Sequence, residues 1–366
     1  MKLDTLPFHI GATAQAVNPG NLPNSYPFEL VFDSYRGMLI QPPDSELEQV
    51  LRDAYALGQA FGTPLAEDKF GKPYAEDFLS FIQSVHAGPA IGLEIGAGVG
   101  YLTRRLLDLG WNMTSLEPGQ GYEPFWSTYG VEVVQDFFPS SQAPGPYQLV
   151  CSYGVLEHVP DPLAFLQQVK CHLTSNGKAV ISVPDCTDEI RAGDPSILFH
   201  EHLNYFDAGS LKRLIGFAGM KAKVAKSQFG RCLYAVASVE HMDGGSDEPG
   251  LDLALVESYP ERCLHFVHRV RDRLTDIVDT GTLGIYCAAR GLALLDPAHT
   301  MRFFDDDPAQ QGKFLPPFQV AIAGRDSLFA KPVDHLVIMS RTFGQRIRHS
   351  LRQQGYRGDI ITLDEM

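Results

Sequence analysis

Short hydrophobic runs alternate with longer helical stretches through the middle of the chain. The apolar run Ile91–Ile95 leads into three glycines, and a helical stretch, Tyr101–Leu109, follows at once. Further strands are predicted at 112–116, 131–134, 147–151 and 178–183, with a helix at 162–173 and a turn at 175–177. Strands that alternate with helices predict a mostly parallel sheet covered by helices, which is the α/β class.

The flanking regions carry fewer signals. A helix is predicted at 44–57 with Asp44 or Ser45 as its N-cap, and a hairpin at 223–239 that turns at 229–230. A long helix at 251–278, broken near Pro260, precedes a smaller α/β unit with strands at 284–287, 301–304, 320–323 and 335–339. The predicted domains are an N-terminal segment 1–72, a central domain 73–240, a polar linker 241–250 and a C-terminal α/β domain 251–366.

The glycines Gly96, Gly98 and Gly100 carry the first chemical signal. Glycine has no Cβ, so the backbone can turn tightly and approach a ligand, and the helix that follows offers free N–H groups. Glu117 ends the next strand, where a carboxylate can accept both hydroxyls of a ribose. Asp136 and Phe137 follow the third predicted strand and can hold an adenine. Together these residues predict a site for a nucleoside-containing cofactor.

Three motifs in this region resemble those of the class I S-adenosylmethionine-dependent methyltransferases: Leu93-Glu-Ile-Gly-Ala-Gly-Val-Gly100, Leu116-Glu-Pro118 and Val155-Leu-Glu-His-Val-Pro-Asp-Pro162. The resemblance covers about 77–239 and implies a Rossmann-like central domain with S-adenosylmethionine as cofactor. The cofactor-binding residues that it implies are Glu94, Gly96, Ala97, Gly98, Gly100, Tyr101, Glu117, Pro118, Asp136, Phe137, Ser152 and Tyr153. A nicotinamide oxidoreductase is disfavoured, because the dinucleotide fingerprint has the spacing G-x-G-x-x-G.

The C-terminal third resembles the bacterial nucleotide-sugar C-methyltransferases, through Gly284-Ile-Tyr-Cys-Ala-Ala-Arg-Gly291, Asp305-Asp-Asp-Pro308 and Gln311-Gly-Lys-Phe-Leu-Pro316. The segment 198–206 matches that family's H-E-H-x-x-Y-F. This resemblance implies methylation of a carbon beside the ketone of a nucleotide-linked keto-deoxysugar. It also implies that His202 is the general base and that His200 and Glu201 orient it or the substrate. Tyr205 is a candidate donor to the enolate oxygen. The candidate substrate-binding residues are His158, Asn204, Arg290 and Lys313, and the basic residues Arg290, Lys313 and Arg341 can meet a nucleotide diphosphate.

Other interpretations of these residues stay open. In extended geometry His200 and His202 face one way and Glu201 the other, so the segment can also be a hydrogen-bonded loop cluster. His158 is a rival base or a residue that stabilises the start of the next helix, and Tyr205 can simply pack with Phe206. The alternative activities are O- or N-methylation of another small metabolite, or S-adenosylmethionine binding without catalysis.

The chain also departs from the nucleotide-sugar family. That family begins with a four-cysteine zinc module, but Asp33 and Arg36 stand where two thiolates are expected. We therefore expect no bound metal, since His200 and His202 alone are too few ligands. Phe199 replaces a tyrosine, which removes a hydroxyl. Cys287 and Ala288 occupy the usual glycine-rich turn, which argues against a phosphate cradle there.

Composition limits the class of protein further. A chain of 366 residues is too long for one ordinary core, and a net charge of −14 argues against nucleic acid or an anionic membrane as partner. The six scattered cysteines form no C-x-x-C pair, and no stretch approaches the ~20 apolar residues that span a bilayer. With no signal peptide, the chain is expected to be cytoplasmic and to act on a small molecule, while the sequence leaves its oligomeric state open.

Overall fold

A computed structural model describes residues 1–8, 11–18, 22–56, 65–68, 71–86, 88–228, 231–239, 247–341 and 343–366, with Arg290 by its backbone alone. These residues form two compact units. One comprises 31–188 and 201–257, and the other 1–30, 189–200 and 258–366. The predicted N-terminal segment 1–72 is thus divided between the units. The predicted hairpin turn at 229–230 and residues 241–246 of the predicted linker lie outside the described residues.

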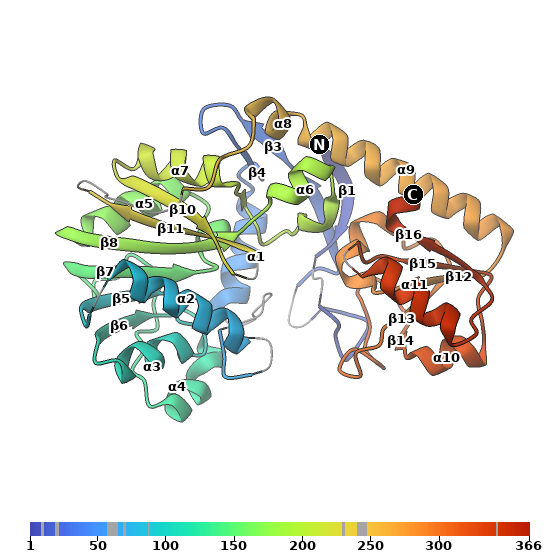
Figure 1. Cartoon of the computed structure of the whole chain (residues 1–366), viewed down its shortest axis with the longest axis horizontal. Helices are drawn as coiled ribbons and strands as arrows, with labels where there is room; N and C mark the ends of the chain where they lie inside the picture. The colour runs from blue at the N-terminus through green and yellow to red at the C-terminus, as the bar shows by residue number, and fades with distance from the viewer. Residues whose placement is uncertain are drawn as a thin grey trace. The chain divides into compact units, whose positions relative to one another are not determined.

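The first unit is built on a six-stranded sheet, labelled in Figure 1. Its strand order is β10 (Lys221–Lys226), β11 (Cys232–Ser238), β8 (Leu173–Pro184), β7 (Tyr147–Tyr153), β5 (Ile91–Ile95) and β6 (Asn112–Leu116). The four strands β8, β7, β5 and β6 are parallel, whereas β11 and β10 run antiparallel to their neighbours. The predicted mostly parallel α/β sheet is therefore confirmed, with β5 and β6 at their predicted bounds.

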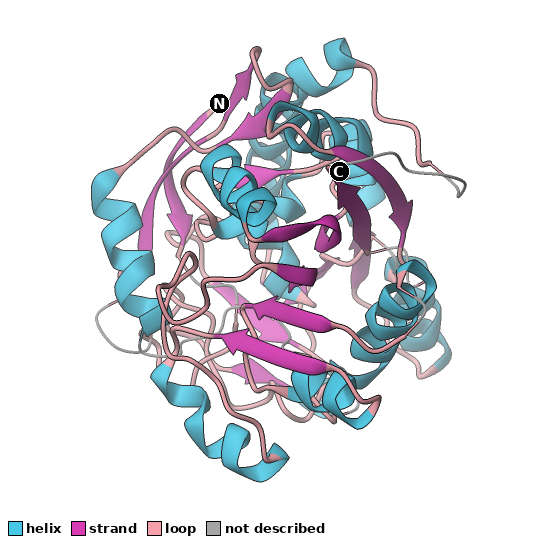
Figure 2. Ribbon diagram, turned by 90° about the vertical axis from the view of Figure 1, so that its left-hand side faces the viewer, coloured by secondary structure: helices cyan, strands magenta, loops and turns pink. Residues whose placement is uncertain are grey.

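Helices cover both faces of this sheet, because its central strands are apolar on both sides. On one face, α2 (Gly71–Val85) and α3 (Tyr101–Asp108) pack Phe78 and Leu106 against Leu149 of β7. On the other face, α5 (Pro162–Cys171) and α7 (Ala208–Phe217) pack against Leu93 and Val150. Figure 2 shows the helices flanking the strands. The parallel strands therefore end at one shared edge, where their loops form the site.

Two local predictions were wrong. The predicted strand 131–134 is reduced to one isolated bridge between Val134 and Leu116, because the chain leaves α4 (Glu123–Tyr129) through a turn that ties Val131 N–H to Trp126 O. The predicted turn at 175–177 lies within β8, whose pairing with β7 shifts register between Tyr147 and Leu149. Both errors lie where the pairing between strands is irregular.

Smaller elements complete the first unit. Its remaining elements are α1 (Ser45–Ala56), η1 (Gln120–Tyr122), η2 (Leu156–His158), α8 (Leu253–Glu257) and a three-stranded sheet of β3 (Val31–Asp33), β4 (Met38–Ile40) and β9 (Asn204–Tyr205). α6 (Thr187–Ala192) begins in this unit and ends in the other. Because β9 pairs with β4, the segment after His202 is anchored as a strand.

The second unit holds a five-stranded parallel sheet. Its order is β14 (Ile322–Ala323), β13 (Met301–Phe304), β12 (Leu283–Tyr286), β15 (His335–Ile338) and β16 (Asp359–Thr362). It also contains β1 (Lys2–Pro7), β2 (Ser25–Glu29), η3 (Pro195–Ile197), α9 (Tyr259–Thr280), η4 (Ala288–Leu294), α10 (Arg325–Ala330), α11 (Gly344–Gln353) and η5 (Leu363–Glu365). The predicted second α/β unit is therefore present. The predicted long helix is interrupted at Ser258, just before Pro260, which separates α8 from α9.

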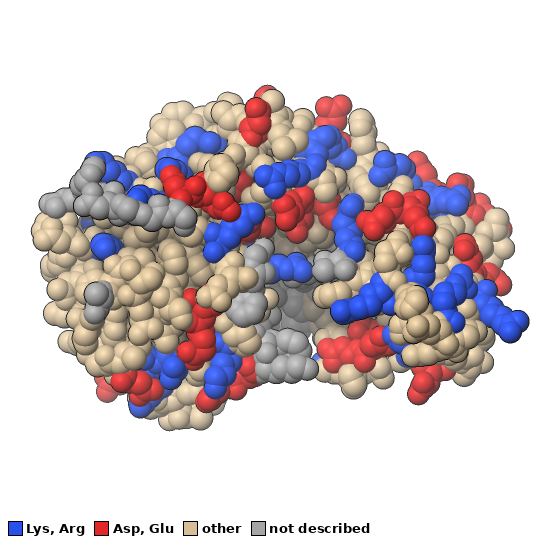
Figure 3. All heavy atoms as spheres, in the orientation of Figure 1, with Lys and Arg blue, Asp and Glu red and all other residues tan. Residues whose placement is uncertain are grey.

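The surface charge is mixed. Figure 3 shows Lys and Arg side chains interspersed with Asp and Glu side chains over the face drawn there. Within the described ranges, every helix falls short of the length or the apolar character that a membrane crossing requires.

Candidate active site

The glycine loop after β5 leaves room for a ligand. Gly96, Gly98 and Gly100 all have positive φ angles, and a Cβ added at Gly98 would meet no heavy atom within 4 Å. The N–H groups of Gly96 and Ala97 donate to Leu116 O at 2.9 and 3.0 Å, which ties the loop to β6. The loop is therefore held in place while one side of its backbone stays bare, as a closely approaching cofactor requires.

Glu117 lies directly beneath this loop. Its two carboxylate oxygens accept hydrogen bonds from Gly98 N–H and Gly119 N–H, each at 2.8 Å. Each oxygen has a second lone pair that can accept a ribose hydroxyl. Burial raises the pKa of the carboxyl group, and the two N–H donors oppose that shift. Pro118 follows at the end of β6, so the predicted ribose acceptor is pre-oriented at the carboxyl edge of the sheet.

The other predicted cofactor residues have different surroundings. Glu94 is buried and accepts a hydrogen bond from the Thr103 hydroxyl, and Ser152 is buried on β7. The Asp136 carboxylate accepts from Phe137 N–H and from the Ser140 hydroxyl, so it closes its own turn.

Two aromatic side chains among the predicted cofactor-binding residues are less buried than Glu94 and Ser152. Phe137 is exposed and available for stacking, with the Arg52 guanidinium 5.7 Å from its ring. The hydroxyl group of Tyr153 lies 3.5 Å from the sulfur of Cys232.

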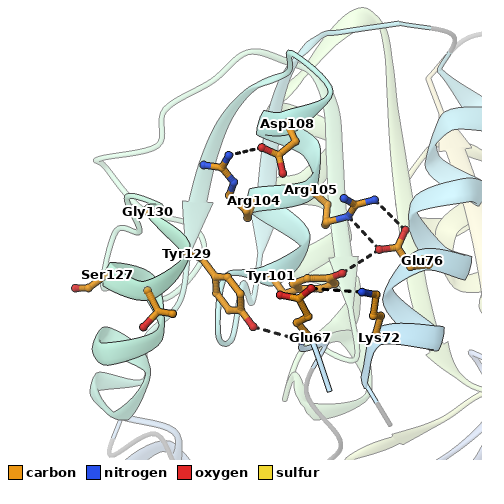
Figure 4. Close-up of a pocket in the computed structure, with 11 residues that line it drawn as sticks. Glu67, Lys72, Glu76, Tyr101, Arg104, Arg105, Asp108, Ser127, Tyr129 and Gly130 are labelled. Carbon is orange, nitrogen blue, oxygen red and sulfur yellow. Dashed lines mark hydrogen bonds and ion pairs between the residues drawn. The ribbon is translucent and has the colours of Figure 1, made fainter. Parts of the chain in front are cut away.

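Tyr101 points away from the glycine loop. Its hydroxyl donates to Glu76 of α2 at 2.9 Å, inside a surface hollow of about 780 Å³ between α2, α3 and α4 (Figure 4). The charged groups of this hollow pair with one another. The pairs are Lys72 with Glu67, Arg105 with Glu76 and Arg104 with Asp108. The Tyr101 hydroxyl is therefore engaged by α2, and a cofactor contact of Tyr101 stays a prediction. The hollow does not suit a charged ligand, because its charged side chains already pair with one another.

Two histidines face each other at the same sheet edge. His158 and His202 have ring centroids 5.1 Å apart. His158 Nδ1 lies 2.8 Å from Glu201 O and 3.1 Å from the Tyr55 hydroxyl. Because a backbone carbonyl only accepts, His158 carries its proton on Nδ1 and presents a lone pair at Nε2. Burial lowers the pKa of His158 to about 4, which makes this ring a weak proton acceptor.

Two buried carboxyl groups lie next to these rings. The Nε2 atom of His158 is 3.8 Å from Oε1 of Glu157. Burial raises the pKa of Glu157 to about 8, and burial together with the Glu157 charge raises that of Glu201 to about 8. Among the described residues, Oε2 of each carboxyl group is buried without a hydrogen-bond partner. Each of these carboxyl groups is therefore protonated more readily than an exposed one, and a protonated carboxyl group can donate a hydrogen bond.

The backbone around His202 is fixed from three sides. Gln41 Nε2 donates to His202 O at 2.8 Å, and Leu203 N–H donates to Glu157 O at 2.8 Å. The Asn204 amide donates to Val159 O at 2.7 Å, so Asn204 is a buried scaffold residue rather than the predicted substrate contact. Tyr205 is likewise 1% exposed within β9. Its ring centroid lies 6.2 Å from that of His202. The donation from its hydroxyl to an enolate stays a prediction.

His200 belongs to the second unit. The segment turns at His200 and Glu201 instead of extending, so the expected alternation of side chains fails. The His200 ring is fully buried in the second unit, stacks on Phe8 at 5.0 Å and lies 3.2 Å from Leu6 O through Nε2. Burial lowers its pKa to about 4. An apolar pocket of its own unit holds the ring, and the orienting role of His200 stays a prediction.

The corresponding edge of the second sheet is filled by side chains. Cys287 follows β12 with a φ of 57°, and Ala288, Leu292 and Met339 are buried around it. A Cβ added at Gly291 would lie 3.0 Å from the Met339 side chain. The crevice where a doubly wound sheet binds phosphate is therefore closed.

The basic residues predicted to meet a nucleotide diphosphate give little support for a phosphate site either. The Arg290 side chain lies outside the described residues. Lys313 N–H donates to Gln310 O within a loop, and Arg341 pairs with Asp194 at 2.5 Å.

Comparison with known proteins identifies the family. The model of a family described as a methyltransferase domain matches residues 68–222. A C-methyltransferase, NovU of Streptomyces niveus, is 23% identical over 283 residues, which cover 70% of this chain and 67% of that protein. The chain is a class I S-adenosylmethionine-dependent methyltransferase.

Solved structures with similar folds were also found. A Burkholderia thailandensis 1,6-didemethyltoxoflavin-N1-methyltransferase, with bound S-adenosylhomocysteine, is 18% identical with a TM-score of 0.41, covering 57% of this chain and 98% of that one. The PH0226 protein of Pyrococcus horikoshii is 14% identical with a TM-score of 0.42, covering 54% and 99%. Both matches span little more than half of this methyltransferase.

The site of this enzyme contains residues that the sequence did not single out. Glu157 was visible only as part of the Leu-Glu-His motif. Tyr55 lies 103 residues before His158 and carries no local signal. The bare backbone at Gly98 and the acceptors of Glu117 fit a nucleoside cofactor, and the cofactor would supply an electrophilic methyl group on a sulfonium. The chain itself supplies imidazole, carboxyl and phenol groups for the acceptor.

Proposed function

We propose that this methyltransferase adds a methyl group to carbon, beside the ketone of a nucleotide-linked keto-deoxysugar, with His202 as general base. The observation that carries the proposal is the relative described as a C-methyltransferase. Its match reaches 70% of the chain, well beyond residues 68–222. The second support is chemical, because a carbon acceptor needs a base and the sheet edge presents two histidines.

The division of labour among the polar residues follows from their surroundings. His202 takes the proton from the carbon alpha to the ketone. Burial lowers the pKa of His158 to about 4, which makes this ring a poor proton acceptor at neutral pH. The Tyr55 hydroxyl, whose pKa burial raises well above 10, stays protonated and donates to the developing enolate oxygen. Tyr55 thereby supplies a hydroxyl in a chain that has Phe199 where the family has tyrosine.

A labelling experiment tests this function. The purified enzyme is given 13C-methyl S-adenosylmethionine and a nucleoside-diphosphate 4-keto-6-deoxyhexose, and the product is examined by NMR. We expect the label on a ring carbon and, with S-adenosylhomocysteine in D2O, exchange of the proton alpha to the ketone. A label on oxygen or nitrogen, without exchange, would favour the alternative of O- or N-methylation of another small metabolite.

A further inference from the structure

Three potential metal ligands converge beside the proposed base. Glu157, His158 and His202 each offer one ligand atom, and these atoms all lie within 4.8 Å of one another. They come from η2 and from the loop before β9, two elements joined by the Leu203 N–H to Glu157 O hydrogen bond. The donor set is two imidazole nitrogens and one carboxylate oxygen.

Independent features of the cluster suit a cation. Oε2 of Glu157 is buried and has no hydrogen-bond partner among the described residues, although a buried carboxyl group ordinarily finds a donor or a cation. His158 donates from Nδ1 to Glu201 O, and its Nε2 lies 3.8 Å from Oε1 of Glu157. A metal-binding histidine characteristically bonds its other ring nitrogen to a carbonyl in this way. The second ring atom is thus already aimed at the carboxyl group.

We propose that Glu157, His158 and His202 form an exchangeable site for a zinc-class transition metal ion, and that occupancy of this site inhibits methyl transfer. Imidazole with one carboxylate is a donor set of zinc, whereas magnesium and calcium prefer oxygen ligands. In a four-coordinate site, three protein ligands leave one coordination position for water. The inhibition rests on the proposed function, since the lone pair of His202 cannot hold a metal and accept a proton at once.

Binding is tested without any methyl transfer. Chelator-treated enzyme is titrated with Co²⁺ and followed by its visible absorption, and Zn²⁺ is then added as competitor. We expect bands of a four- or five-coordinate site that Zn²⁺ abolishes. Loss of a residue that only contacts a metal ligand already weakens metal binding about 10–100-fold. Loss of a ligand itself, in Glu157→Gln or His158→Asn, should therefore weaken Co²⁺ binding by at least ~10-fold. Thermal unfolding checks that both variants fold.

The matched control is His86→Asn. His86 is also a half-buried histidine with Nδ1 at a backbone carbonyl, 2.9 Å from Gly88 O, but it lies outside the cluster. This variant should bind Co²⁺ as the wild type does. Wild-type enzyme without such bands, or variants that keep wild-type affinity, would overturn the site.

Inhibition is measured separately. With an accepted substrate, Zn²⁺ should stop methyl transfer over the concentration range in which it displaces Co²⁺, and EDTA should restore the rate. Full activity with the site occupied would overturn the inhibitory role. An enzyme that binds Co²⁺ as expected but transfers no methyl to any keto-sugar would contradict the proposed function and leave the metal site supported.

Discussion

The two units share one local arrangement of strand and turn, but the space beside that turn differs between them. In each, a central strand of a parallel sheet runs into a tight turn, at Gly96–Gly100 after β5 and at Cys287–Gly291 after β12. A Cβ at Gly98 would meet no heavy atom within 4 Å, whereas one at Gly291 would lie 3.0 Å from Met339. Topology therefore offers two candidate crevices, and side-chain packing closes one of them.

The difference shows what a ligand site needs beyond the fold. The first turn has bare backbone and a strand-end acid, Glu117, whose oxygens are already oriented by two N–H groups. The second turn has buried apolar side chains in the same place, and its strand-end acid, Asp305, accepts from Asp307 N–H in an exposed turn. We infer that cofactor binding and base chemistry both belong to the first sheet.

The largest expected effect comes from the base at the first sheet. Removal of a general base typically costs about 10²–10⁴-fold in rate. His202→Asn should therefore turn over at least ~100-fold more slowly and still bind S-adenosylhomocysteine nearly normally, because the proposed role of His202 is toward the acceptor and not toward the cofactor. Single-turnover kinetics and calorimetry separate the two quantities. A nearly inactive His158→Asn beside an active His202→Asn would reverse the assignment.

Next in size is the effect on cofactor affinity. Loss of a charge-assisted acceptor costs roughly 1.5–3 kcal/mol, so Glu117→Ala should bind S-adenosylhomocysteine at least about tenfold more weakly. The matched control is Asp305→Ala, which alters the topologically equivalent acid after β13 and should leave the affinity unchanged. Calorimetric titration of both variants decides the comparison, and equal losses would mean that the second crevice also binds cofactor.

The first crevice was predictable from sequence because its signals are local. The strands β5 and β6 are followed directly by a glycine and by Glu117, and both strands have their predicted bounds. The cluster around His158 and His202 was only partly predictable. The position of Tyr55 depends on how α1 packs, and His200 is drawn into a pocket of Phe8 and other aromatic residues, which no alternation pattern reveals. Tertiary packing therefore decided what local pattern could not.

A smaller effect is expected in the pH dependence of stability. Burial raises the pKa of Glu94, on the strand before the glycine loop, from its ordinary value of 4.5 to about 8. The folded state therefore holds a proton that the unfolded state releases between about pH 4.5 and 8, and stability falls as the pH rises through this window. One such group contributes at most about 1.4 kcal/mol per pH unit. Urea unfolding should show a shallower pH slope for Glu94→Gln, and an unchanged slope would mean that Glu94 is charged in the native state.

The smallest effect probes the closed crevice. Cys287 has a left-handed backbone, which costs a residue with a Cβ roughly 1–2 kcal/mol and costs glycine nothing. Cys287→Ala keeps the Cβ and the strain, so Cys287→Gly should be the more stable of the two by about 1 kcal/mol, after the greater freedom of unfolded glycine is deducted. Thermal unfolding measures the difference, and S-adenosylhomocysteine affinity should be equal in both variants. If the glycine variant gained an affinity for nucleoside diphosphate that the alanine variant lacks, the Cβ of residue 287 would be what closes the second crevice.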